Sequence, residues 1–277
     1  MAPAQHTCGH VIALFSCKGG VGTTFLTTQL GCFLALRWQL KVLVIDGVHP
    51  FGDASLMLSQ NEPKATLGDL LRHPERFDDA LLESTLLWPQ PRLGVLAAPD
   101  NPLQDAALIP DGCLAILEAA RAHFDCILVD CGRAMDARMM ALLRAADRLL
   151  PVLQSTLPMV RDGRRLLSAV IAQGIDPTHI LPVLNRVSAA SVPQPKTMDR
   201  ALGAHVEHQI PEDAVLVRNC IEGAHALWHQ APFHPISQSL ITLARALVPA
   251  PEPTGSKPHG PLQRWWKKQW RWNPQHP

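Results

Sequence analysis

Short apolar runs alternate along the chain with longer segments in which apolar residues recur at helical spacing. The short runs predict strands buried on both faces of a sheet, because their apolar residues are consecutive. These strands are expected at 10–16, 41–46, 92–97, 125–130, 147–154, 179–185 and 205–210. The longer segments predict helices at 25–38, 110–123, 136–146, 159–173, 213–222 and 235–248, with two shorter helices between 66 and 83.

This alternation predicts one α/β domain over residues 10–248, preceded by a short extension over 1–9. Strands that alternate with helices form a mostly parallel, doubly wound sheet, here of about seven or eight strands, with helices on both faces. Ligands of such sheets bind beyond the carboxyl ends of the strands. The segment 17–24, Asp46 and Asp130 all fall at those ends.

The segment 17–24 is a variant phosphate loop between the first strand and the first helix. In the ordinary loop, backbone amides wrap the phosphates, a lysine reaches the β- and γ-phosphates, and a hydroxyl holds magnesium. Here Thr23 replaces that lysine and Thr24 supplies the hydroxyl. The helix N-terminus adds its partial positive charge, so the segment predicts a nucleotide site. The residues predicted to bind the nucleotide here are Lys18, Gly19, Gly20, Val21, Gly22, Thr23, Thr24 and Phe25.

A glycine-rich turn without a ligand is the alternative interpretation of this segment. The lysine, the spaced third glycine and the paired threonines argue against it, because a simple turn requires none of them.

Two aspartates end neighbouring strands and are candidates for the metal shell. Asp130 is predicted to hold Mg²⁺, directly or through water, opposite the Thr24 hydroxyl. The alternative role for Asp130 is the N-cap of the next helix. Asp46 is predicted to bind the same metal shell or to orient water, and Asp53 to cap the segment that follows it.

Composition and charge narrow the class of protein. The chain has 277 residues, 47% of them hydrophobic, and a net charge of only +1, so no global field points to nucleic acid. The seven cysteines form neither a C-x-x-C pair nor a zinc spacing, which predicts a reduced, cytoplasmic compartment. We expect no signal peptide and no membrane-spanning helix.

The C-terminal residues form a proline-rich linker, 249–261, and a basic, tryptophan-rich tail, 262–277. Four of the seven tryptophans lie in this tail beside basic residues. Such a pattern is typical of a helix that lies in a membrane interface, while a protein partner or non-specific nucleic acid are the alternatives. The residues predicted to contact the membrane are Trp265, Trp266, Lys267, Lys268, Trp270 and Arg271.

The run from Lys18 to Gly22, Lys-Gly-Gly-Val-Gly, resembles the signature of the MinD/ParA ATPases, and the resemblance extends over about residues 10–248. It implies that the chain binds ATP with Mg²⁺ and forms a homodimer in which the catalytic lysine, Lys18, reaches the partner's phosphates. The closer resemblance is to the pilus-assembly CpaE/TadZ branch, through Phe51-Gly52-Asp53, the segment 66–71 and the substituted loop lysine. It further implies that Asn185, Arg186, Pro211 and Glu212 contact the nucleotide base.

The chain departs from the family pattern at two positions. Thr23 stands in place of the loop lysine, and Val48 stands where family members commonly carry an aspartate that positions the attacking water. Each such group is worth on the order of 10²–10³ in rate. We therefore expect ATP binding with weak or absent hydrolysis. We also expect no receiver-like domain before the first strand.

The resemblance implies a cytoplasmic dimer at the inner face of the membrane that positions a Flp-type pilus or a related secretion assembly. Three other functions stay open. The chain could be a cellulose-synthesis accessory protein of the same superfamily, an active partitioning ATPase, or a scaffold that binds no nucleotide.

Overall fold

A computed structural model describes residues 9–72, 78–101, 109–188 and 195–248. Residues 1–8 of the predicted extension, the linker and the tryptophan-rich tail lie outside the described residues. In the part of the chain that is described, no helix is long and apolar enough to cross a membrane.

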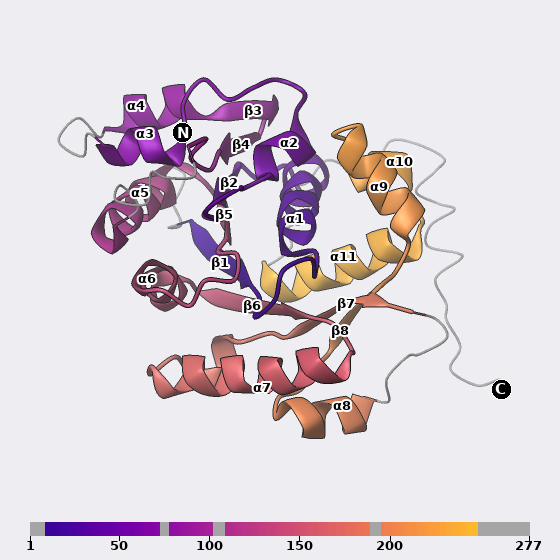
Figure 1. Cartoon of the computed structure of the whole chain (residues 1–277). Helices are drawn as coiled ribbons and strands as arrows, with labels where there is room; N and C mark the ends of the chain where they lie inside the picture. Colours follow the sequence, from indigo (N-terminus) through magenta and orange to yellow (C-terminus); the bar gives the residue numbers. More distant parts are fainter. Residues whose placement is uncertain (1–8, 73–77, 102–108, 189–194, 249–277) are drawn as a thin grey trace, which may run out of the picture.

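The strands form one eight-stranded sheet in the order β3-β4-β2-β5-β1-β6-β7-β8 (Figure 1). All neighbouring pairs are parallel except β3 with β4, which are antiparallel. This topology confirms the predicted doubly wound α/β fold. The strands are β1 His10–Phe15, β2 Val42–Asp46, β3 Leu87–Gln90, β4 Leu93–Leu96, β5 Cys126–Asp130, β6 Arg148–Leu153, β7 Val183–Val187 and β8 His208–Pro211.

Helices cover both faces of the sheet (Figure 1). The α1 and α11 helices pack on one face, while α5 and α6 pack on the other. The helices are α1 Thr23–Arg37, α2 Ala54–Leu58, α3 Leu67–Arg72, α4 Asp79–Thr85, α5 Pro110–His123, α6 Ala137–Ala145, α7 Leu157–Ala172, α8 Pro195–Leu202, α9 Ala214–Glu222, α10 Leu227–Gln230 and α11 Pro235–Leu247, with a short 3-10 helix, η3, at Pro177–His179.

The central strands bury apolar side chains on both faces of the sheet. In β1, Ile12 and Leu14 join the core under α1 and α11, whereas Val11 and Ala13 join the core under α5 and α6. Successive side chains of a strand point to opposite faces, so a strand covered on both sides must be apolar throughout. The uninterrupted apolar runs in the sequence arise from this double coverage.

Several elements differ from the sequence-based expectation. The edge strand β3 and the helices α2, α8 and α10 were not predicted. The strand β7 begins at Val183 and not at 179, since residues 177–179 form η3. A short edge strand that contains Pro89 lacks the apolar run of a central strand. Asp53 is the N-cap residue of α2 as expected, but its side chain makes no capping hydrogen bond.

The α1 helix lies close to the sheet at Gly31. A Cβ atom built on Gly31 would meet Cγ2 of Val44 at 2.9 Å and Cδ1 of Leu93 at 3.3 Å. We therefore expect Gly31→Val to lower the free energy of unfolding by about 1–3 kcal/mol, because extra methyl groups overpack this contact. Urea denaturation checks the value.

The matched control is Ala169→Val, which adds the same branched side chain to an exposed position of α7. Helix propensity alone costs that variant less than about 1 kcal/mol. Equal losses in the two variants would contradict the packing explanation.

Candidate functional site

The glycine-rich loop connects the end of β1 to the first turn of α1. Gly20 and Gly22 have φ values of 75° and 95°, which side-chain-bearing residues rarely adopt. Gly22 is the N-cap residue of α1, and its carbonyl accepts the Leu26 N–H at 3.0 Å. The loop therefore ends at a helix N-terminus, whose free amides and partial positive charge favour an anion.

Asn185 connects the loop to the far part of the sheet. Its Nδ2 atom donates to the Val21 carbonyl at 2.7 Å, and its side chain is buried. A Cβ atom on Gly22 would overlap this amide, so the third glycine of the loop is also required for space. The sequence suggested Asn185 for base recognition; in the structure its amide group donates to the phosphate loop.

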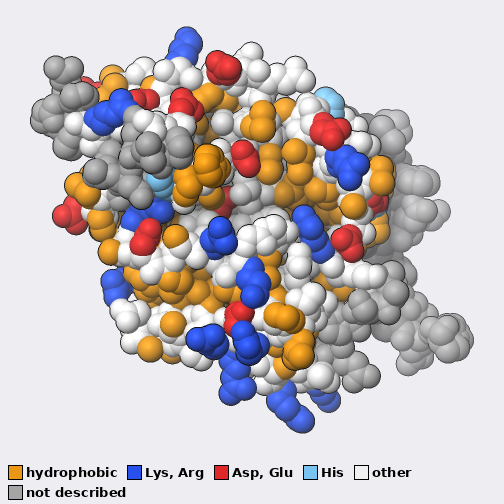
Figure 2. Space-filling view, in the orientation of Figure 1, with side chains coloured by type: hydrophobic (Ala, Val, Ile, Leu, Met, Phe, Trp, Pro, Cys, Tyr) orange, Lys and Arg blue, Asp and Glu red, His pale blue; other side chains and the backbone are white. Residues whose placement is uncertain are grey.

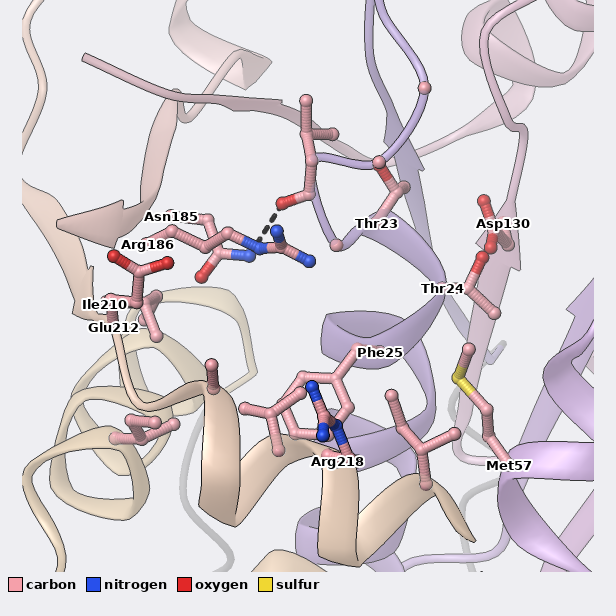
Figure 3. Close-up of a pocket in the computed structure, with 18 of the residues that line it drawn as sticks. Thr23, Thr24, Phe25, Met57, Asp130, Asn185, Arg186, Ile210, Glu212 and Arg218 are labelled. Atoms are coloured by element: carbon pink, nitrogen blue, oxygen red, sulfur yellow. Dashed lines mark hydrogen bonds between the residues drawn. The ribbon is translucent and has the colours of Figure 1, made fainter. Parts of the chain in front are cut away.

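A cavity of about 610 Å³ opens beside the loop and runs along α1 toward α9. Thr23, Thr24 and Asp130 lie at one end, while Arg186 and Glu212 lie at another (Figure 3). Each residue predicted to bind the nucleotide lines this cavity. The lining residues that were predicted are Lys18, Gly19, Gly20, Val21, Gly22, Thr23, Thr24, Phe25, Asp130, Asn185, Arg186, Pro211 and Glu212.

One carboxylate oxygen of Asp130 accepts a hydrogen bond and the other does not. Its Oδ1 accepts the Gly132 N–H at 3.0 Å, whereas its buried Oδ2 has no partner among the described residues. Burial raises the pKa of Asp130, and the neighbouring Thr24 hydroxyl partly opposes the shift (Figure 3). An unpartnered buried carboxylate oxygen beside a hydroxyl fits a hydrated Mg²⁺ ion.

The alternative role for Asp130, capping of the next helix, is excluded. The N-cap of α6 is Asp136, whose Oδ1 accepts the Met139 N–H at 2.8 Å. Asp130 lies six residues before Asp136, and its carboxylate accepts the N–H of Gly132 in the turn after β5.

Asp46 lies beside Asp130 in the sheet but does not line the cavity. Its Oδ1 accepts the Val48 N–H at 3.1 Å and its Oδ2 accepts the Ala54 N–H at 2.8 Å. Burial first, and the adjacent Asp130 second, raise the pKa of Asp46. In this structure Asp46 holds the segment 48–54, and its role in the metal shell stays a prediction.

Lys18 lies on the rim of the cavity and forms an ion pair with α7. Its Nζ atom is 2.7 Å from Oδ2 of Asp162, and the Lys18 side chain is 41% exposed. Arg161 and Arg165 also approach Asp162, at 3.1 Å and 3.6 Å. The hydrogen bond from Lys18 lowers the pKa of Asp162 to about 2, so Asp162 stays charged at neutral pH.

Sequence reasoning missed a set of cavity residues on α2, on α9 and after β5. Met57 lines the cavity on the side of Thr24 and Arg218 on the side of α9 (Figure 3), and Arg133 lines it close to Gly19. Arg218 had no sequence signal, because it lies within a helix far from the loop. Arg133 follows the strand-ending Asp130 and Gly132, which is a signal that could have identified it.

A protein-family model described as an AAA domain matches residues 9–173, more than half of the chain. The chain belongs to this family. Its relatives place it in the MinD/ParA superfamily. The septum site-determining protein MinD of Thermotoga maritima is 28% identical over 180 residues, which are 64% of this chain and 64% of that protein. The chain thus matches just under two thirds of that relative's length.

Solved structures share the fold. The ParA family ATPase of Chlorobium tepidum superimposes with a TM-score of 0.79 at 23% identity and covers 86% of this chain and 99% of its own. MinD of Pyrococcus horikoshii, solved with Mg-ADP, superimposes with a TM-score of 0.73 at 24% identity, covering 86% of this chain and 95% of its own.

The raised pKa values of Asp46 and Asp130 make the stability of the protein depend on pH. The folded state holds their protons above the unfolded pKa of about 4, so stability falls as the pH rises from there through the folded values. We expect Asp130→Asn to remove part of this slope and to increase the free energy of unfolding at pH 8 by roughly 1–3 kcal/mol. Thermal and urea unfolding between pH 4 and pH 8 measure it.

The control is Asp111→Asn, at an exposed position in the first turn of α5. This change should not reproduce the gain at pH 8. A lower stability of Asp130→Asn at pH 8 would contradict the proposed cost of the buried charge.

Proposed function

We propose that the protein is a MinD-like, ATP-binding dimer that positions a Flp-type pilus or related secretion assembly at the inner face of the membrane, with weak or absent hydrolysis. The observation that supports nucleotide binding best is the set of polar side chains on the two sides of the loop. Asn185 holds the loop from one side, and the unpartnered oxygen of Asp130 stands beside Thr24 on the other.

The residues present fit ATP with Mg²⁺. The amides of the loop would hold the phosphates, Thr24 and Asp130 would hold the metal shell, and Phe25 would pack beside the nucleotide. Arg186, Pro211 and Glu212 would meet the base at their end of the cavity. Bound Mg²⁺ would supply positive charge that neutralises the phosphates.

Weak hydrolysis is supported by two side chains of the cavity. Thr23 is largely buried and carries no charge where the ordinary loop has an ammonium group. Val48 lines the cavity with an apolar side chain, and a Cβ atom on Gly132 would meet its Cγ2 at 3.4 Å. Neither side chain carries a charge that could stabilise a transition state, and the apolar Val48 side chain cannot orient water.

Dimerisation is supported by the surface around the cavity. Lys18 is on the rim, and Leu157 of α7 and Val215 of α9 are 83% and 71% exposed. Figure 2 shows basic and hydrophobic side chains interspersed over this face. Such a surface fits a partner that brings both apolar contacts and phosphate charge, as a second nucleotide-bound copy would.

The membrane role rests on the tail that contains Trp265, Trp266, Lys267, Lys268, Trp270 and Arg271. The tail lies outside the described residues, so its contact with lipid stays a prediction, as does the cytoplasmic, peripheral location. A dimer would present two tails and would bind more tightly than a monomer.

An active partitioning or septum-positioning ATPase is the second candidate. The similarity to MinD of Thermotoga maritima and to the ParA family ATPase of Chlorobium tepidum favours it. Robust phosphate release would support this second candidate over the first.

Restoring the missing groups tests the hydrolysis argument. We expect Thr23→Lys alone to tighten ATP binding on the order of tenfold, because a charged group returns to the loop. The double variant Thr23→Lys with Val48→Asp should increase phosphate release by on the order of 10²-fold or more over the wild type. Calorimetry and a phosphate-release assay measure the two effects.

The variant Val48→Ala is the matched control, since it changes the same side chain without adding a carboxylate. If the wild-type protein released phosphate as fast as the double variant, the predicted weak hydrolysis would be contradicted. Absence of any heat with ATP and Mg²⁺ would instead favour a scaffold without nucleotide.

The ion pair between Lys18 and Asp162 generates a second test. We expect Asp162→Asn to increase the ATP-dependent dimer fraction, because it releases Lys18 for the partner's phosphates. Lys18→Ala should remove the dimer. Light scattering with and without ATP measures both fractions.

The control is Arg165→Gln, which alters a 77% exposed neighbour of Asp162 but leaves Lys18 and its partner in place. An unchanged dimer fraction in Lys18→Ala would contradict the bridging role.

A further inference from the structure

The loop lacks its usual lysine, so another cation must balance the phosphates if the proposed function holds. We propose that Arg133 supplies this charge, from within the same chain, to the terminal phosphates of bound ATP. The inference rests on the proposed nucleotide binding and goes beyond it by assigning a residue to the role that Thr23 cannot perform.

The turn after β5 places Arg133 beside the loop. Gly132 has a φ of 65°, donates its N–H to Asp130, and accepts the Ser16 N–H on its carbonyl at 3.0 Å. These bonds fasten the turn to the end of β1, directly before the loop. Arg133 is therefore carried by backbone that is bonded both to the candidate metal site and to the base of the loop.

The Arg133 side chain lies close to Gly19. A Cβ atom built on Gly19 would be 3.9 Å from the Cδ, Nε and Cζ atoms of Arg133 alike. The space into which a side chain at position 19 would project is therefore bordered by the Arg133 side chain. Arg133 also lines the same cavity as Thr23 and Thr24.

Arg133 is exposed and makes no hydrogen bond or ion pair with any described residue. The other cations of the cavity are differently placed. Lys18 is paired with Asp162 at 2.7 Å. Arg186 begins beside Glu212 and its guanidinium extends toward Asn185 and the loop, whereas Arg218 comes from α9 and lies away from the loop threonines (Figure 3). Among the described residues, Arg133 shares an unpaired charge with Arg186, but Arg133 lies beside Gly19 and follows the turn that is bonded to Asp130, the candidate metal ligand.

The chemistry of the guanidinium suits this role. It stays charged at every accessible pH and presents a planar set of N–H donors that can bind phosphate oxygens in pairs. A lysine at the start of α1 would bring one point charge from below the phosphates. Arg133 would bring its charge from the turn after β5, which leaves the position of Thr23 free to be uncharged.

Calorimetry with ATP, ADP and AMP, each with Mg²⁺, tests the assignment on the full-length chain. The variants are Arg133→Gln and Arg133→Lys. The matched control is Arg92→Gln, in the exposed turn before β4, at the end of the sheet opposite the cavity. Light scattering in the same buffer selects a protein concentration at which the chain is monomeric, so that only a contribution in cis is measured.

We expect Arg133→Gln to weaken ATP binding about tenfold or more, ADP binding less, and AMP binding not at all. Arg133→Lys should recover part of the loss. The thermal midpoint of the ligand-free protein should not move, because the side chain has no described partner. Arg92→Gln should bind all nucleotides as the wild type does.

Either of two results would overturn the role of Arg133 and leave the proposed function standing. In one, Arg133→Gln binds ATP as tightly as the wild type; in the other, it loses ATP, ADP and AMP binding equally. If the wild-type protein and Arg92→Gln bind no nucleotide, the proposed function itself fails, and the role of Arg133 fails with it.

Discussion

The hydrogen bond from Asn185 to the Val21 carbonyl holds the site together. It joins β7 to the glycine loop over a distance of 164 residues in the sequence, and at 2.7 Å it is buried in the protein interior. Buried polar bonds of this kind are costly to leave unmade, so the loop conformation and the packing of β7 depend on each other. The cavity exists because the loop, the end of β7 and α9 are held in one arrangement.

The paired carboxylates show how the fold stores unfavourable energy at this site. Asp46 and Asp130 are register partners at the ends of β2 and β5, and both are buried. Two backbone amides satisfy Asp46, whereas one oxygen of Asp130 is left without a described partner. The buried Asp130 carboxylate lowers the stability of the fold at the position where it would bind a cation. Functional sites commonly cost the fold stability in this way.

Several cationic side chains surround the loop, whereas the ordinary phosphate loop carries one lysine at the start of its helix. Lys18 is held on α7 by Asp162, Arg133 lies close to Gly19, and Arg186 and Arg218 line the remainder of the cavity. Charge is therefore distributed around the loop instead of concentrated at the start of α1.

The sequence by itself determined most of the succession of strands and helices, the loop and the aspartate that ends β5. These features follow from local rules, because a strand covered on both faces is apolar throughout and a left-handed turn requires glycine. The antiparallel β3 escaped prediction, since its four residues carry no such run. Only the tertiary structure decided that Asp46 bonds backbone amides, that Lys18 pairs with α7, and that Arg133 and α9 reach the cavity. Such contacts join residues far apart in the chain, and the sheet order that brings them together is not written in any local pattern.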